Sequence, residues 1–182
     1  SGNGDITQTG ALTILKDTTI TATGNDVTLN LASNDFDSSG NGNKLTVIGK
    51  NVNIQDSNKL KLVPTISGNL TVLAGNNIDD GGLVDVDGTT DITSTGGYVK
   101  FNDNCSGGVC SDFTGAVSID ANNEIKLKDA NSIELGTITC TSCNFTLTAS
   151  QDTTGTVTQT NTGSITITGI TTITNTGGDV TL

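Results

Sequence analysis

Short runs in which aliphatic residues alternate with threonine recur along the whole chain. Leu12-Thr13-Ile14 lies near one end, and Ile165-Thr166-Ile167 lies near the other. A period of two predicts strands with one buried face, and Val, Ile and Thr favour strands. Gly-Asn, Gly-Gly and Asn-Asn steps separate the runs and are typical of turns. No window of helical length keeps a helical period, so the sequence predicts an all-β fold.

A long internal repeat organises these runs. The segment 18–29 returns as 90–101, and it returns again, after a slightly longer interval, as 171–182. The intervening strands also align, as Leu45-Thr46-Val47 does with Val117-Ser118-Ile119. Further matching pairs are 52–54 with 125–127, 60–62 with 133–135, and 69–74 with 144–149. We expect a single β-helix segment over residues 1–182, divided into super-repeats 1–72, 73–153 and a partial one at 154–182.

Several short strands in each stretch of about 20 residues favour a right-handed parallel β-helix, or β-solenoid, over a sandwich of hairpins. Such strands pair with the coil above at about 4.8 Å, and the length of the chain then corresponds to about eight or nine coils. Aromatic residues make up only 3% of the chain, and Trp and Met are absent. A core of Val, Ile, Leu and Ala fits a narrow, elongated solenoid. The one proline, Pro64, leaves continuous sheets almost unobstructed.

The charge of the chain excludes some classes of function. The formal net charge is −11, and the eight positive charges are all Lys. Nucleic-acid binding requires basic residues clustered on one face, and anionic membranes are disfavoured for the same reason. No apolar run approaches the length of a membrane span, and no amino-terminal segment resembles a signal peptide. We expect the chain to be a segment of a larger repeat protein, with its targeting signals elsewhere.

The sequences of the repeats resemble the repeat region of the filamentous haemagglutinin family, whose members are large exoproteins exported by two-partner secretion. The resembling phrases are 5–13 (DITQTGALT), 133–138 (IELGTI), 145–150 (FTLTAS) and 176–182 (TGGDVTL). The resemblance implies a right-handed β-helical shaft that is secreted or lies on the bacterial cell surface. It also implies a role in adhesion, aggregation or display of distal domains, with no catalytic residues in the repeats.

Four cysteines depart from that resemblance. They form two local pairs: Cys105 and Cys110 fall in the variable segment 102–115, and Cys140 and Cys143 fall where the second unit is two residues longer than the first. In an exported protein we expect two local disulfides that close small loops. Pairing between the loops, a four-thiolate zinc site and a redox Cys-x-x-Cys remain alternatives, although only the second pair has the spacing of a zinc knuckle.

The densest acidic stretch offers a candidate cation site. On a strand 84–87, Val84 and Val86 point inward, and Asp85 and Asp87 point outward on the same face. Two carboxylates helped by carbonyl oxygens suit Ca²⁺. The alternative is that alternating Asp keeps a strand soluble, and no EF-hand loop or Gly-Gly-x-Gly-x-Asp ladder is complete.

Parallel β-helices also include polysaccharide lyases and hydrolases, so the fold class by itself admits an enzyme. The chain has no Arg and no His, which lyases and nucleophile-base triads use. A hydrolase needs a pair of carboxylates at a defined separation, and the chain offers only Glu124, Glu134 and scattered Asp residues. Ice binding would require outward Thr rows at constant register, as Thr19-Ile20-Thr21 and Thr172-Ile173-Thr174 begin to form. A register map distinguishes these cases: a Thr array favours ice, an acidic face favours cation or glycan contact, and irregular decoration favours a passive shaft.

We therefore expect an extracellular structural or adhesive segment, without enzymatic activity, cofactor or resident metal. Its partners would be adjacent coils of the same chain or end-to-end copies, with cell-surface glycans or receptors as further candidates; nucleic acid and membrane insertion are not expected. The alternative function is a self-assembling extracellular filament subunit, because both ends of a solenoid expose unpaired sheet edges. A polysaccharide-binding or polysaccharide-degrading β-helix and an ice-binding solenoid rank below these.

Overall fold

The computed structural model describes residues 4–102, 110–149 and 154–182. These residues contain twenty strands and no helix. In chain order the strands are β1 (Ile6–Thr7), β2 (Thr18–Thr21), β3 (Val27–Leu29), β4 (Leu45–Gly49), β5 (Val52–Asp56), β6 (Leu60–Ile66), β7 (Leu70–Ala74), β8 (Ile78–Asp80), β9 (Asp85–Val86), β10 (Thr90–Ser94), β11 (Val99–Phe101), β12 (Asp112–Phe113), β13 (Val117–Ala121), β14 (Glu124–Lys128), β15 (Ile133–Cys140), β16 (Asn144–Ala149), β17 (Val157–Gln159), β18 (Ile165–Ile167), β19 (Thr171–Asn175) and β20 (Val180–Thr181).

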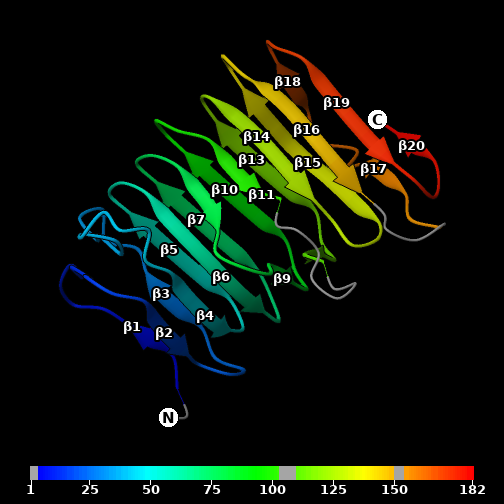
Figure 1. The fold of residues 1–182 in the computed structure, drawn as a ribbon. Helices are drawn as coiled ribbons and strands as arrows, with labels where there is room; N and C mark the ends of the chain where they lie inside the picture. Colours follow the sequence, from blue (N-terminus) through cyan, green and yellow to red (C-terminus); the bar gives the residue numbers. More distant parts are fainter. Residues whose placement is uncertain (1–3, 103–109, 150–153) are drawn as a thin grey trace.

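The strands form two parallel sheets that the chain visits in turn. Sheet 1 is built in the order β1, β3, β5, β7, β10, β13, β15, β17 and β20, with β18 beside β15; sheet 2 contains the other strands. All strand pairs that the structure describes are parallel. Figure 1 shows the resulting elongated stack, with the two termini at opposite ends. The chain is a parallel β-helix, and sheet 1 stacks nine levels within the described residues.

Coil length varies while the strands of each sheet stay paired. Val52 pairs with Leu70 at the next level, whereas Thr90 pairs with Val117, so the coil from Thr90 to Val117 is half as long again. Within its described part, the long coil adds β12 between β11 and β13, and Val117 still lies beside Thr90. A coil can therefore lengthen without disturbing the pairing of its strands.

Stacked aliphatic side chains form the core between the two sheets. Along most strands the burial alternates, as in β7, where Leu70, Val72 and Ala74 are buried. Each of these residues lies directly over its counterpart in the next coil, so that Leu70 is followed by Thr90 and then by Val117. Burial of aliphatic surface contributes about 25 cal/mol per Å². The core therefore grows along the axis of the solenoid, one coil at a time.

Polar ladders hold the turns that precede the strands of sheet 1. The Asp26 Oδ1 atom accepts a hydrogen bond from the N–H of Asn51 at 3.2 Å, and the Asn51 Oδ1 atom accepts one from the N–H of Asn69 at 3.1 Å. The Asn69 Oδ1 atom in turn accepts one from the N–H of Thr89 at 2.9 Å. At Gly88 the coils approach so closely that a Cβ atom would overlap the Gly68 carbonyl oxygen and the Asn69 side chain. These turns need the small and amide residues that the sequence places there.

Pro64 lies inside β6, where a missing N–H would normally break a ladder. On one side of it, β6 pairs with β8 through Leu62 and with β9 through Thr65. The chain leaves the sheet between β8 and β9, opposite Pro64. The proline is therefore accommodated because its neighbouring coil is interrupted at the same level.

Candidate functional site

The two outer faces of the solenoid are the candidate functional surfaces. Across sheet 1, the central outward row reads Thr7, Thr28, Asn53, Thr71, Asp91 and Ser118. Across sheet 2, the corresponding row reads Lys61, Asp79, Lys100, Lys126, Thr146 and Thr172. Neither of these two rows is a continuous Thr array or a uniformly acidic face. The decoration is irregular, which is the pattern expected of a passive shaft.

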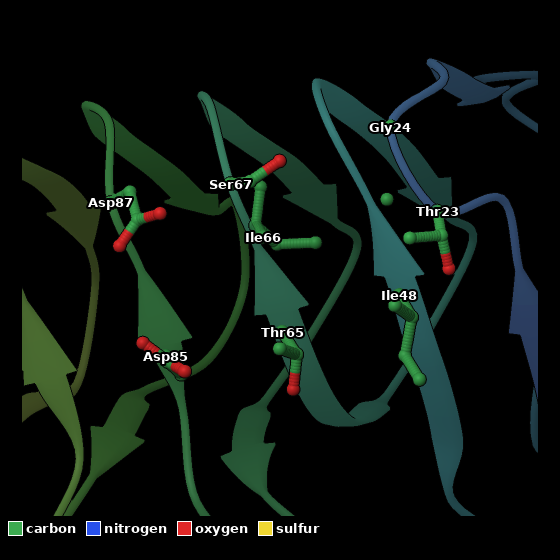
Figure 2. A pocket seen from close by; sticks show the side chains of 9 residues that line it. Thr23, Gly24, Ile48, Thr65, Ile66, Ser67, Asp85 and Asp87 are labelled. Atoms are coloured by element: carbon green, nitrogen blue, oxygen red, sulfur yellow. The ribbon is translucent and has the colours of Figure 1, made fainter.

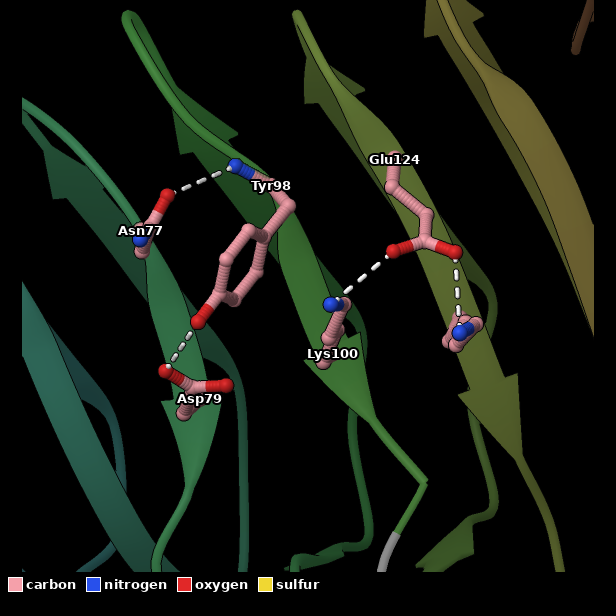
Figure 3. Close-up of polar contacts among 6 residues, drawn as sticks. Asn77, Asp79, Tyr98, Lys100 and Glu124 are labelled. Atoms are coloured by element: carbon pink, nitrogen blue, oxygen red, sulfur yellow. Dashed lines mark hydrogen bonds and ion pairs between the residues drawn. The ribbon is translucent and has the colours of Figure 1, made fainter.

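Charged side chains on sheet 2 pair with one another across the coils (Figure 3). Tyr98 donates its hydroxyl to Asp79 at 2.9 Å, and the Lys100 ammonium lies 4.0 Å from the centre of the Tyr98 ring. Glu124 accepts from Lys100 and from Lys126, both at 2.9 Å. Partial burial and the bond to Asp79 raise the pKa of Tyr98 to about 12, while the two lysines lower the pKa of Glu124. These groups bind each other and form a polar surface over the sheet.

The predicted cation candidates lie beside a shallow groove of about 190 Å³ (Figure 2). Val84 and Val86 are buried, and Asp85 and Asp87 are exposed on the same side. Partial burial, with Asp87 and the cross-strand neighbour Asp112, raises the pKa of Asp85. The sequence reasoning missed Asp112, which the next coil brings beside Asp85.

The groove has an apolar component as well. Ile48 and Thr65 line it together with the two carboxylates. Within the part of the chain that the structure describes, no group of three or more His, Cys, Asp or Glu side chains is arranged to hold a metal ion. The calcium hypothesis for Asp85 and Asp87 stays a prediction from the sequence.

One predicted cysteine pair lies in a tight turn. Cys140 and Cys143 form a disulfide between β15 and β16, with their Cα atoms 5.6 Å apart. The Cys140 side chain is buried in the ladder between Ala121 and Ile167. Cys110 is also buried and disulfide-bonded, and Cys105 lies outside the described residues. The bond between Cys140 and Cys143 therefore closes a corner of the shaft next to its core.

Two buried aspartates, which the sequence reasoning did not single out, fasten loops to the shaft. Asp56 accepts the N–H of Phe36 at 2.8 Å and the N–H of Asn58 at 2.7 Å. Both Asp56 and Phe36 are almost completely buried. Burial raises the pKa of Asp56, although these hydrogen bonds oppose the shift.

Asp129 makes the same pattern elsewhere in the solenoid. It accepts the N–H of Phe113 and the N–H of Asn131, each at 2.9 Å. Burial raises its pKa to about 6. The recurring signal in the sequence is an Asp-Phe pair in one coil and an Asp-x-Asn in the following coil.

The carboxylates that were weighed for hydrolysis are not brought together. Glu124 lies on the outer face of sheet 2, where it binds the two lysines described above. Glu134 is exposed on sheet 1, opposite Thr158. The two lie on different faces of the solenoid.

Among the described residues, no helix is long and apolar enough to span a membrane.

The fold and its outer faces define a parallel β-helical repeat protein. More particularly, the chain belongs to the family described as repeats of unknown function (DUF5649), whose model matches residues 1–41, 49–120 and 121–182. The second and third matches begin at positions 49 and 121, the same offset that separates segment 18–29 from segment 90–101. No curated protein and no solved structure matches the chain.

Proposed function

We propose that this chain is an extracellular shaft segment of a large bacterial surface or secreted exoprotein of the filamentous haemagglutinin type. Its role is to give length, to carry distal domains away from the cell, and to support adhesion or aggregation. The observation that carries the proposal is the irregular decoration of both faces over a mostly aliphatic core. A surface selected for one ligand would repeat its chemistry coil after coil, whereas these faces vary.

The charges support the same proposal. Glu124 pairs with Lys100 and Lys126 on sheet 2, and the two glutamates lie on different faces. The strands of each sheet meanwhile stay paired through the short coil that starts at Val52 and the long coil that starts at Thr90. The architecture therefore preserves the shaft and lets its surface vary.

Electron microscopy of the native material, with the gene product identified by mass spectrometry, tests the proposal. Thin rods made of one long chain with a secretion domain are expected. An in-frame deletion of the repeats from that full-length product should shorten the rods and reduce cell attachment and autoaggregation, while the distal domains remain folded. Unchanged attachment after the deletion would refute the adhesive role.

The second candidate function is a filament subunit that stacks end to end. A solenoid end that no further coil covers exposes unpaired sheet edges, to which a second copy can add. Regular filaments built from many short copies in the same micrographs would establish this function and remove the exoprotein proposal.

A further inference from the structure

Within one repeat unit the chain visits the two sheets alternately, and the number of these visits, or passes, is odd. In the first unit the chain runs through β1 to β7, alternating between sheet 1 and sheet 2, and the next unit begins at β8. Ile6, the first residue of β1, is in sheet 1, but its equivalent Ile78 in β8 is in sheet 2. The second unit also makes seven passes in the described residues, because β8 and β9 lie in one sheet and so do β11 and β12. One unit is therefore three and a half coils.

Equivalent strands consequently change sides from one unit to the next. The segment 18–21 is in sheet 2, its equivalent 90–94 is in sheet 1, and the third copy 171–175 is in sheet 2 again. At one of the two outward positions all three copies carry threonine, as Thr21, Thr93 and Thr174, whereas the other position carries Thr19, Asp91 and Thr172. The alternation therefore involves the exposed surface as well as the backbone.

The buried aspartates support the equivalence independently of the strand pattern. Asp56 ends β5 in sheet 1, and Asp129 follows β14 in sheet 2. Each accepts the backbone N–H of a phenylalanine, which is Phe36 in a loop and Phe113 in β12, and the N–H of the asparagine two positions on. The residue after each aspartate also donates its N–H to the loop, from Ser57 at 2.7 Å and from Ala130 at 2.8 Å. The same loop attachment thus occurs in both units with the sheets exchanged.

Successive units are related by a half turn about the axis and a rise of roughly 17 Å, at about 4.8 Å per coil. We propose that a shaft built from these repeats displays equivalent positions of successive units on alternate sides of its axis. The proposal rests on the shaft function.

Single-site biotin labels test the two-sided display on the full chain. Thr21→Cys, Thr93→Cys and Thr174→Cys are made singly and in pairs and are labelled with maleimide-biotin under oxidising conditions. The unsubstituted protein is the control for labelling at native cysteines. Each doubly labelled chain is captured through one biotin on a flat streptavidin surface, and binding of soluble streptavidin to the other biotin is measured.

Capture through position 21 should leave the biotin at position 93 fully accessible and the biotin at position 174 blocked. Capture through position 93 should leave both other sites accessible. A blocked position 93, or an accessible position 174, after capture through position 21 overturns the proposal. Both results are independent of adhesion, so a failed adhesion assay would leave this display geometry standing.

A deletion of one unit supplies the second test. Removal of the segment 47–118 deletes the length of one repeat and joins Leu45-Thr46 to Ile119, the strand equivalent of Val47. Asp129 then takes the place of Asp56 and holds the Asp35-Phe36 loop. The remaining coils turn by half a turn, so position 174 becomes accessible after capture through position 21. A deletion protein that gives a cooperative circular-dichroism melt and keeps position 174 blocked contradicts the proposal; if it does not fold, the full-length pairs decide.

Discussion

Thr90 is a polar residue in the middle of an aliphatic ladder, and its replacement by valine should stabilise the shaft. It lies between Leu70 and Val117 in sheet 1 and is 1% exposed. Its Oγ1 atom has no hydrogen-bond partner among the residues that the structure describes. A buried hydroxyl without a partner costs about 1–3 kcal/mol. Valine has nearly the same shape, so Thr90→Val should remove this cost without creating a cavity.

We expect Thr90→Val to raise the free energy of unfolding by about 1–2 kcal/mol. For a chain of this size each kcal/mol corresponds to about 2–4 °C in Tm. Urea unfolding followed by far-ultraviolet circular dichroism measures the change, because the chain has no Trp. Thr71→Val, at an exposed outward position of the neighbouring strand, is the matched control and should stay within about 0.5 kcal/mol.

An unchanged or lower stability of Thr90→Val would refute the reasoning, since it would mean that the hydroxyl is already satisfied in solution. A gain of equal size in Thr71→Val would also refute it. That result would assign the effect to the strand preference of valine and not to the buried hydroxyl.

Three further outcomes are expected. The pKa of Asp129 is raised from 3.8 to about 6 in the folded chain, so the folded chain binds this proton more tightly than the unfolded chain does. The free energy of unfolding should therefore rise as the pH falls from about 7 to about 4, by at most ~3 kcal/mol. Unfolding titrations over this range should show a smaller pH dependence in Asp129→Asn, and an equal slope would contradict the assignment. Gly88→Ala should lose about 1–3 kcal/mol through overlap with the adjacent coil, whereas Gly10→Ala, with open space around its Cβ, should not, as thermal melts can show. Replacement of both Cys140 and Cys143 by Ala should cost about 2 kcal/mol in urea unfolding through the lost loop closure, and equal stability of this variant and the oxidised parent would count against a stabilising disulfide.

The fold class was predictable because its signal is local. Alternation along 84–87 predicts which valines are buried, and the structure has Val84 and Val86 inside with Asp85 and Asp87 outside. The stacking of coils follows from repeats of strand-length runs. The prediction of an all-β parallel solenoid with about eight or nine coils is therefore confirmed.

The loop attachments could not be read in the same way, because their partners lie in different coils. Phe36 reaches forward to Asp56, and Phe113 reaches forward to Asp129. The loops also differ internally, since the offset from Asp35 to Asp112 is larger than the offset between the matching strands that flank these loops. An alignment that keeps the strands in register therefore misaligns the Asp-Phe pairs.

The arrangement of side chains on the outer faces was harder still to predict. Asp112 lies beside Asp85 only because a long coil returns to the sheet at that level. The relation to filamentous haemagglutinin stays a prediction from the wording of the repeats. The family that the chain belongs to is defined by the repeats themselves.

The pairing of each strand with the coil next to it has a mechanical consequence. The coils that start at Val52 and at Thr90 each make their sheet hydrogen bonds to their immediate neighbours. Under tension along the chain, the last coil can peel away while the remainder stays wound. Each peeled coil releases roughly 60–90 Å of extended polypeptide. A solenoid of this kind is expected to lengthen in many small steps under load and to rewind on the remaining coils when the load falls.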